Sequence, residues 1–166
     1  MSRAFVKEPD GDADPPDPPE RVHSPHPNYV TSEGLRQLHR RVADLLAERA
    51  PLAGSGDPDA RRRLRLIDRD LRYVEERIRR AVLVDPAGQP EGEVAFGSVV
   101  EVEAPEGRRL TFAIVGEDEA DVSQGRISWV SPLAEALMEA RAGDTVAWRR
   151  PTGEVELTIV SIRNGV

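Results

Sequence analysis

Acidic and basic side chains meet in one short stretch of the sequence, "LAGSGDPDARRR" at residues 52–63. Asp57 and Asp59 stand one residue apart, directly before three consecutive arginines. Aspartate followed by proline is a frequent helix start, so Asp57 can act as a helix cap while Asp59 complements the helix dipole. The alternative is a working tip whose acids and arginines act on a partner, since arginine forks bind phosphates well. The sequence leaves both interpretations open.

Two helical patterns flank this stretch and would hold it at the end of a hairpin. Thr31 is a suitable N-cap, and the apolar spacing after it predicts a helix over 32–49. A second helix is predicted to begin after Asp57, and its apolar residues follow a heptad seam: Leu64, Ile67, Leu71, Val74, Ile78 and Ala81. Because amphipathic helices with a short connection bury their stripes together, residues 31–85 are predicted to form an antiparallel coiled-coil hairpin.

Beyond residue 85 the pattern changes to short segments rich in β-branched residues and separated by glycine-containing turns. Strands are predicted in "GSVVEVEA", "RLTFAIVG", "GRISWV", "DTVAWRR" and "EVELTIVSI". The segment "SPLAEALMEAR" interrupts them with a Ser-Pro helix start. Residues 86–166 are therefore predicted to be an α+β domain, an antiparallel sheet covered by one helix. Trp129 and Trp148 are expected to pack on that sheet.

Charge is unevenly distributed along the 166 residues, whose net formal charge is −7. Residues 1–30 hold 3 basic and 6 acidic residues, residues 31–85 hold 13 and 10, and residues 86–166 hold 7 and 14. An acidic chain with a basic middle does not suit sequence-specific or wrapping contact with duplex DNA, which needs a broad cationic face. The distribution favours docking on a large partner that already holds nucleic acid.

Composition also indicates which part of the chain is disordered and where the protein is located. Residues 1–30 are rich in proline and acid and poor in large apolar side chains, so a disordered tail is expected. The chain has no cysteine, which excludes disulfides and thiolate sites and fits a reducing compartment. No apolar run reaches the length of a membrane span, so a cytoplasmic protein without membrane contact is expected. Because the two helices of the hairpin would bury their apolar faces against each other, a monomer is expected.

Three segments of the chain resemble a known family. The run "IVGEDEADVSQGRISWVSPLAEALMEARAGDTV" resembles the GreA/GreB family of bacterial transcript-cleavage factors in its glycine-acid cluster, GxIS strand and Ser-Pro helix start. "NYVTSEGLRQL" and "LRLIDRDLRYVEERI" are similar to the family's two hairpin helices, especially in GreB-like members, so the likeness spans residues 28–163. The resemblance implies a coiled-coil hairpin, here shortened, and an FKBP-like α+β domain. It also implies docking on RNA polymerase, with the hairpin in the secondary channel near the nascent RNA 3′ end.

The tip departs from the family where the chemistry takes place. In active members, an aspartate and a glutamate three residues apart, in a tip close to G-D-x-S-E-N-A, help to hold Mg²⁺ in the polymerase active site. Gly56 and Asp57 match this pattern, but Ala60 stands at the glutamate position. Asp57 and Asp59 are thus candidate catalytic acids at the polymerase Mg²⁺, while the departure and the short hairpin argue against strong cleavage stimulation. No cofactor of the chain's own, no metal held by it alone and no autonomous catalysis are expected.

Two further surfaces follow from the resemblance. The basic side of the second helix is implied to contact nascent RNA or polymerase acids through Arg61, Arg62, Arg63, Arg65, Arg69 and Arg72. The alternative is a solvated face paired with neighbouring acids. Docking on the polymerase is implied for Glu117, Asp121, Ser131, Pro132 and Leu133. For Leu133 the alternative is a buried helix start.

Other functions stay open from the sequence. One is that of the short-hairpin relative that regulates nucleoside diphosphate kinase, which pairs an abbreviated coiled coil with the same globular domain. Another is a prolyl isomerase or chaperone, prompted by the implied FKBP-like fold, although its pocket would need an aromatic lining and the domain is poor in aromatic residues. A coiled-coil scaffold whose tip is only a turn is the third.

Overall fold

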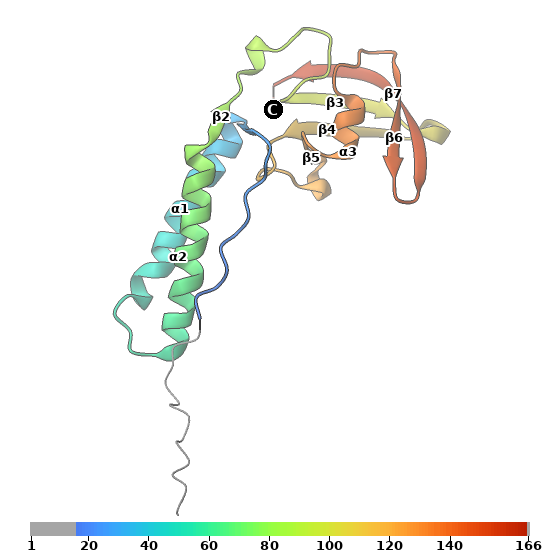
Figure 1. The fold of residues 1–166 in the computed structure, drawn as a ribbon. Coiled ribbons are helices and arrows are strands. Elements are labelled where there is room, and N and C mark those ends of the chain that lie inside the picture. The colour runs from blue at the N-terminus through green and yellow to red at the C-terminus, as the bar shows by residue number, and fades with distance from the viewer. Residues whose placement is uncertain (1–15, 166) are drawn as a thin grey trace, which may run out of the picture.

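The computed structural model of the chain describes residues 16–165, which form a helical hairpin and a sheet-rich globular part (Figure 1). The hairpin consists of α1 (Ser32–Arg49), a 3₁₀ helix (Ala50–Leu52) and α2 (Pro58–Arg79). Thr31 caps α1 by accepting a hydrogen bond from the amide of Gly34, and Asp57 caps α2 by accepting one from the amide of Asp59. Both predicted N-caps and the predicted range 32–49 are confirmed.

The apolar faces of α1 and α2 pack together along the hairpin. Their buried core is formed by Val30, Leu38, Leu45, Ile67, Leu71 and Val74. Leu46, an apolar residue next to this face, is 50% exposed. It follows Leu45 by one residue, which rotates its side chain by about 100° away from the centre of the apolar stripe. The supercoil of a true coiled coil stays a prediction.

A small parallel sheet closes the base of the hairpin. β1 (Asn28–Val30) precedes α1, β2 (Ala81–Leu83) follows α2, and the two strands pair along their whole length. The sequence pattern predicts neither strand, because three residues are too few to display an alternation of apolar and polar side chains. Since β1 lies within the tail expected for residues 1–30, the ordered structure begins before the predicted boundary.

The described part of the expected tail contains no helix or strand over residues 16–27, yet it lies along α2 (blue in Figure 1). Glu20 pairs with Arg72 at 2.5 Å, and the ring of His23 stacks on Tyr73 at 4.7 Å. In this segment, charged and ring contacts take the place of apolar burial, and the expected disorder stays a prediction. Residues 1–15 of the expected tail lie outside the described residues.

The globular part is built on a five-stranded sheet. Its strands are β3 (Ser98–Glu103), β4 (Arg109–Val115), β5 (Arg126–Ser128), β6 (Thr145–Arg150) and β7 (Gly153–Asn164). They lie in the order β5-β4-β3-β7-β6, and neighbours are antiparallel except β4 and β5. This parallel pair corrects the prediction of a wholly antiparallel sheet. The segment 116–125 returns the chain to the middle of β4, where Arg126 lies opposite Ala113, so β5 runs in the same direction as β4.

One short helix, α3 (Pro132–Leu137), covers the sheet core. It ends earlier than the predicted segment, which reaches residue 141. Met138 has a non-helical ψ of 141°, and Glu139 then adopts a φ of 66°. Further 3₁₀ turns lie at Pro86–Gly88, Pro105–Gly107 and Val122–Gln124. The mixed α+β class is confirmed, whereas the closer FKBP-like description stays a prediction. Among residues 16–165, no helix has the length and apolar character to cross a membrane.

Candidate functional site

The tip of the hairpin exposes Asp57 and Asp59 at the start of α2. Asp57 Oδ1 accepts a hydrogen bond from the Asp59 amide at 3.1 Å, and the Asp57 amide donates to Ser55 Oγ at 3.2 Å. Ala60 is only 8% exposed and faces the hairpin interior. Asp57 is therefore engaged as a helix cap, and the buried residue Ala60 carries no carboxylate. In the described part of the chain, no group of three or more His, Cys, Asp or Glu could hold a metal ion.

The six predicted arginines do not form one face. Four recur at intervals of three, four and three residues along α2 and form the basic stripe: Arg62, Arg65, Arg69 and Arg72. Arg63 reaches across to α1, where its Nη2 lies 2.9 Å from the Glu48 carboxylate. Arg61 is half-buried on another side of α2. The surface available to an anionic partner is thus narrower than the sequence predicts.

Acids already lie against the basic stripe. Arg69 pairs with Asp70 on the same helix at 2.9 Å, as the solvated-face alternative predicts. Arg72 pairs with Glu20 and is hydrogen-bonded to it, and this bond lowers the pKa of the Glu20 carboxyl below its ordinary value. Part of the stripe is therefore occupied by the segment that precedes the hairpin.

A buried arginine ties α2 to the globular part. Arg77 is 1% exposed, its Nε donates to Asp118 Oδ2 at 2.6 Å, and its Nη2 lies 3.5 Å from the Glu117 carboxylate. Its carbonyl accepts a hydrogen bond from Asn28 Nδ2 at 2.7 Å. A buried guanidinium is stable only when counter-charges face it. Glu117, predicted as a docking residue, also takes part in this internal contact, and its role in docking stays a prediction.

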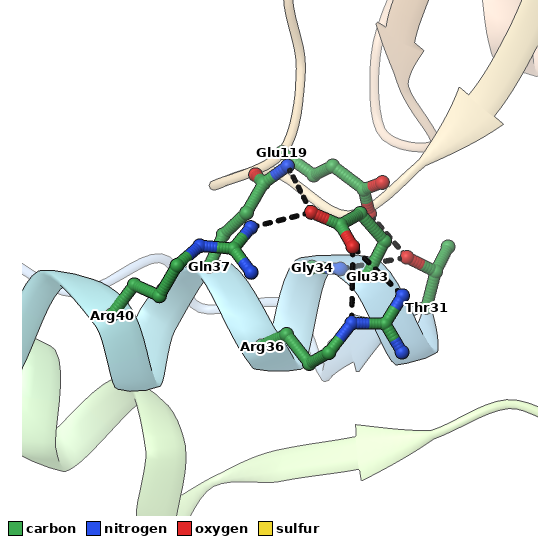
Figure 2. A network of polar contacts seen from close by, with 7 residues as sticks. All are labelled: Thr31, Glu33, Gly34, Arg36, Gln37, Arg40 and Glu119. Carbon is green, nitrogen blue, oxygen red and sulfur yellow. Dashed lines mark hydrogen bonds and ion pairs between the residues drawn. The ribbon is translucent and has the colours of Figure 1, made fainter.

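Figure 2 shows a second contact of this joint, at the first turn of α1. Thr31 Oγ1 donates to Glu119 Oε2 at 2.5 Å while accepting from the Gly34 amide at 2.9 Å. A Cβ on residue 34 would stand 2.6 Å from the same carboxylate oxygen, so any larger residue here would force the Glu119 side chain to shift. Beside it, Glu33 accepts hydrogen bonds from three side chains of α1: Arg36, Gln37 and Arg40.

The other predicted docking residues fall into different environments. Asp121 accepts a hydrogen bond from the Ser123 hydroxyl, which is the main reason that the pKa of its carboxyl is lowered. Ser131 caps α3, and Pro132 is exposed. Leu133 is 5% exposed and belongs to the sheet core. The prediction of Leu133 as an exposed contact is therefore wrong, because the first turn of α3 points it at the sheet.

A cavity of about 600 Å³ lies beside the joint, lined by Tyr29, Phe96 and Met138 among others. Tyr29 belongs to β1 at the base of the hairpin, so the cavity lies between the two parts of the molecule. Trp129 packs on the sheet core as predicted, and its ring also lies 4.9 Å from that of Tyr29. Most of the lining residues, among them Gln89, Val94 and Phe96, belong to the globular part, so the position of the cavity does not distinguish the isomerase alternative from the others.

Comparison with known proteins identifies the family. Residues 89–164 match the family described as "Transcription elongation factor, GreA/GreB, C-term". Transcription elongation factor GreB of Neisseria meningitidis serogroup B is 37% identical over 151 residues, covering 81% of this chain and 93% of that protein. The chain belongs to the GreA/GreB family. The predicted resemblance is confirmed, and a role in transcription elongation is supported at the level of the family.

Other relatives extend this assignment to both branches of the GreA/GreB family. Transcription elongation factor GreB of Pseudomonas putida is 41% identical over 153 residues, covering 83% of this chain and 94% of that protein. Transcription elongation factor GreA of Alkalilimnicola ehrlichii is 39% identical over 106 residues, covering 63% and 67%. Among solved structures, GreA factor homolog 1 (Gfh1) of Thermus thermophilus is 25% identical to this chain, with a TM-score of 0.40. The match covers 84% of this chain and 100% of the Gfh1 chain.

The residues of the joint are the ones that sequence reasoning missed. Arg77 lies three residues after Val74, on the apolar side of α2, and a charge in that position is a signal of a buried counter-ion. Nothing in the sequence around Glu119 indicates burial, because this residue lies in a run of acids that is typical of a solvent-exposed loop. Only the fold brings this run against the hairpin.

Proposed function

We propose that this chain binds RNA polymerase, with its globular part docked beside the secondary channel and its hairpin reaching into the channel. Similarity to GreB factors over 81% of the chain supports the proposal. The hairpin extends away from the sheet and carries its tip at the far end (Figure 1). With 18 residues, α1 spans about 27 Å. The buried contacts of Arg77 and Glu119 hold the hairpin against the globular part. Docking of the globular part would therefore also set the position of the tip.

The tip is proposed to occupy the channel without strongly stimulating transcript cleavage. The observation that carries this point is Ala60, which is buried at the position where active members carry the glutamate. Asp57 is engaged as a helix cap, and Asp59 stands one residue before the required position. Because displacement of a positioned catalytic group is costly, these residues do not fit a strong Mg²⁺ contact. No catalytic step through Mg²⁺ is therefore assigned to them.

The basic stripe is proposed to face nascent RNA near its 3′ end. Arginine forks bind phosphates, and Tyr73 beside the stripe offers a ring on which a base can stack. On the globular part, Pro132 is exposed and Asp121 and Ser131 are partly exposed, so these three are proposed for docking on the polymerase. The result is a monomeric cytoplasmic regulator of elongation, pausing or access of other channel factors.

A stalled, backtracked elongation complex with 3′-labelled RNA and Mg²⁺ tests the proposal. We expect the wild-type protein to release no short 3′ fragments rapidly and to compete with an authentic cleavage factor for the complex. The variant Asp57→Ala/Asp59→Ala is expected to compete equally well. A variant of equal charge change on the exposed face of β7, Glu154→Ala/Glu156→Ala, is the matched control.

Rapid fragment release by the wild type and the control, lost in the tip variant, would show that the divergent tip is catalytic. Failure of the wild type to compete would contradict channel binding. Failure to compete, together with binding to nucleoside diphosphate kinase, would favour the alternative regulatory function.

A further inference from the structure

Residues 16–24, here called the acidic segment, follow the basic stripe of α2 over two successive ion pairs. Asp17 lies 3.7 Å from Arg65, and Glu20 lies 2.5 Å from Arg72. The hydrogen bond from Arg72 lowers the pKa of the Glu20 carboxyl below its ordinary value, which favours the negatively charged form. The segment therefore presents negative charges to arginines of the stripe.

The spacing of these pairs follows from the geometry of the two chains. Prolines 16, 18 and 19 favour an extended segment that rises about 3.1 Å per residue, against about 1.5 Å per residue in a helix. From Asp17 to Glu20 the segment would advance about 9 Å, and from Arg65 to Arg72 the helix advances about 10 Å. The two acids can thus meet Arg65 and Arg72, two arginines of the stripe that are separated by Arg69, without strain.

An aromatic contact fixes the segment next to the charges. The imidazole of His23 stacks on the Tyr73 ring with centroids 4.7 Å apart and planes within 4°. The guanidinium of Arg21 lies 3.8 Å from the centre of the same ring. Arg80 Nη2 also donates to the Ser24 carbonyl at 3.3 Å. Single-stranded nucleic acid binds by placing phosphates near cationic side chains and stacking bases on aromatic rings. The carboxylates and the His23 ring of the acidic segment occupy the corresponding positions on the stripe and on Tyr73.

We infer that the acidic segment is an intramolecular competitor that covers the basic stripe and is displaced by single-stranded RNA. This inference rests on the proposed function for the RNA contact and adds its regulation. Exposed ion pairs are individually weak, so the cover can be displaced instead of closing the surface permanently. The apparent affinity for RNA is then the intrinsic affinity reduced by the fraction of molecules in which the segment is released.

The first test locates the segment in the full-length protein. Because the chain has no cysteine, Pro16→Cys can carry a single nitroxide label. Pro16 lines a surface hollow together with Arg62, Arg65 and Leu66, so amide signals of α2 around residues 62–66 are expected to broaden. Saturating oligouridine is expected to restore them. Absence of broadening, or broadening that persists with RNA bound, would overturn the inference.

The second test measures RNA affinity by fluorescence anisotropy with labelled oligouridine. Asp17→Asn/Glu20→Gln is expected to bind roughly threefold to tenfold more tightly than the wild type, since two exposed ion pairs are lost. The matched control Glu154→Gln/Glu156→Gln changes net charge equally on β7 and is expected to leave affinity unchanged. His23→Ala releases the ring contact without removing an acid, so it is also expected to tighten binding.

These outcomes separate the inference from the proposed function. Equal RNA affinity of the wild type, Asp17→Asn/Glu20→Gln and His23→Ala would overturn the intramolecular cover while leaving polymerase binding intact. Tighter binding by the charge variant alone, without an effect of His23→Ala, would indicate simple repulsion and also overturn it. Tighter binding of both variants to polymerase but not to RNA would assign the covered surface to a protein partner and contradict the RNA inference.

Discussion

The hydroxyl of Thr31 donates a 2.5 Å hydrogen bond to the buried carboxylate of Glu119, which lies 88 residues further along the chain. The same oxygen accepts the hydrogen bond that caps α1. One side-chain atom therefore both begins the hairpin and ties it to the globular part. A change at this point is expected to affect the stability of the fold and the direction of the hairpin together.

Gly34→Ala is expected to lower the free energy of unfolding by about 1–2 kcal/mol. The added methyl group would stand 2.6 Å from Glu119 Oε2, which must move and lose its hydrogen bond from Thr31. A hydrogen bond to a charged group contributes about 1.5–3 kcal/mol, and the better helix propensity of alanine returns up to about 1 kcal/mol. Urea denaturation measures the difference.

Two further variants make the Gly34 result specific. Gly88→Ala, at an exposed glycine with open space around it, is expected to change stability by less than about 0.5 kcal/mol. Thr31→Val removes the same hydrogen bond, so its effect and that of Gly34→Ala should not add in the double variant. Full additivity would show that the loss at Gly34 does not act through this contact.

Arg77→Met is expected to destabilise the protein by about 2–3 kcal/mol. The change leaves the carboxylates of Glu117 and Asp118 without the guanidinium that faces them, and removal of one partner from a buried pair is costly. The figure is at the low end because the Asp118 side chain is 26% exposed. Arg79→Met, at a side chain that is 77% exposed, is the control. Equal losses in both variants would contradict a special role of Arg77.

Most regular elements could be predicted because their signals are local. Asp57 and Pro58 start α2 through the chemistry of the first helical turn, and the seam residues define its buried face. The strands β3 and β4 follow from β-branched runs bounded by turns, and their pairing is that of a short hairpin. The departure of the tip at Ala60 follows from the resemblance to the family motif, and its effect on cleavage stays a prediction.

The rest depended on contacts between distant segments. Glu119 is an acid within an acidic run, and only the arrival of Thr31 explains its burial. Leu133 was open to two interpretations, because a Ser-Pro helix start fixes the helix but not which face meets the sheet. The position of residues 16–24 along α2 could not be inferred from composition, since the contacts that place them there are made with α2 and involve charged and aromatic side chains.

Leu133→Ala is expected to lower the free energy of unfolding by about 2–4 kcal/mol, because it opens a cavity in the sheet core. Pro132→Ala changes an exposed residue and should leave stability nearly unaltered. If docking involves this end of α3, Pro132→Ala is expected to weaken polymerase binding at full stability. Weakened binding by Leu133→Ala without any loss of stability would contradict the buried position of Leu133.

The pH dependence of Glu33 is the last expectation, and its sign follows from its neighbours. Hydrogen bonds from Arg36, then Arg40 and Gln37, lower the pKa of Glu33 from 4.5 to about 2. Since the folded-state pKa is lowered, the stabilising effect of ionised Glu33 is complete above pH 4.5 and is lost as the pH falls toward 2. Carbon NMR of the carboxyl group should follow this titration, and the variant Arg36→Gln/Arg40→Gln should shift the midpoint upward toward 4.5. An unchanged midpoint in that variant would show that the two arginines do not hold the Glu33 carboxylate in solution.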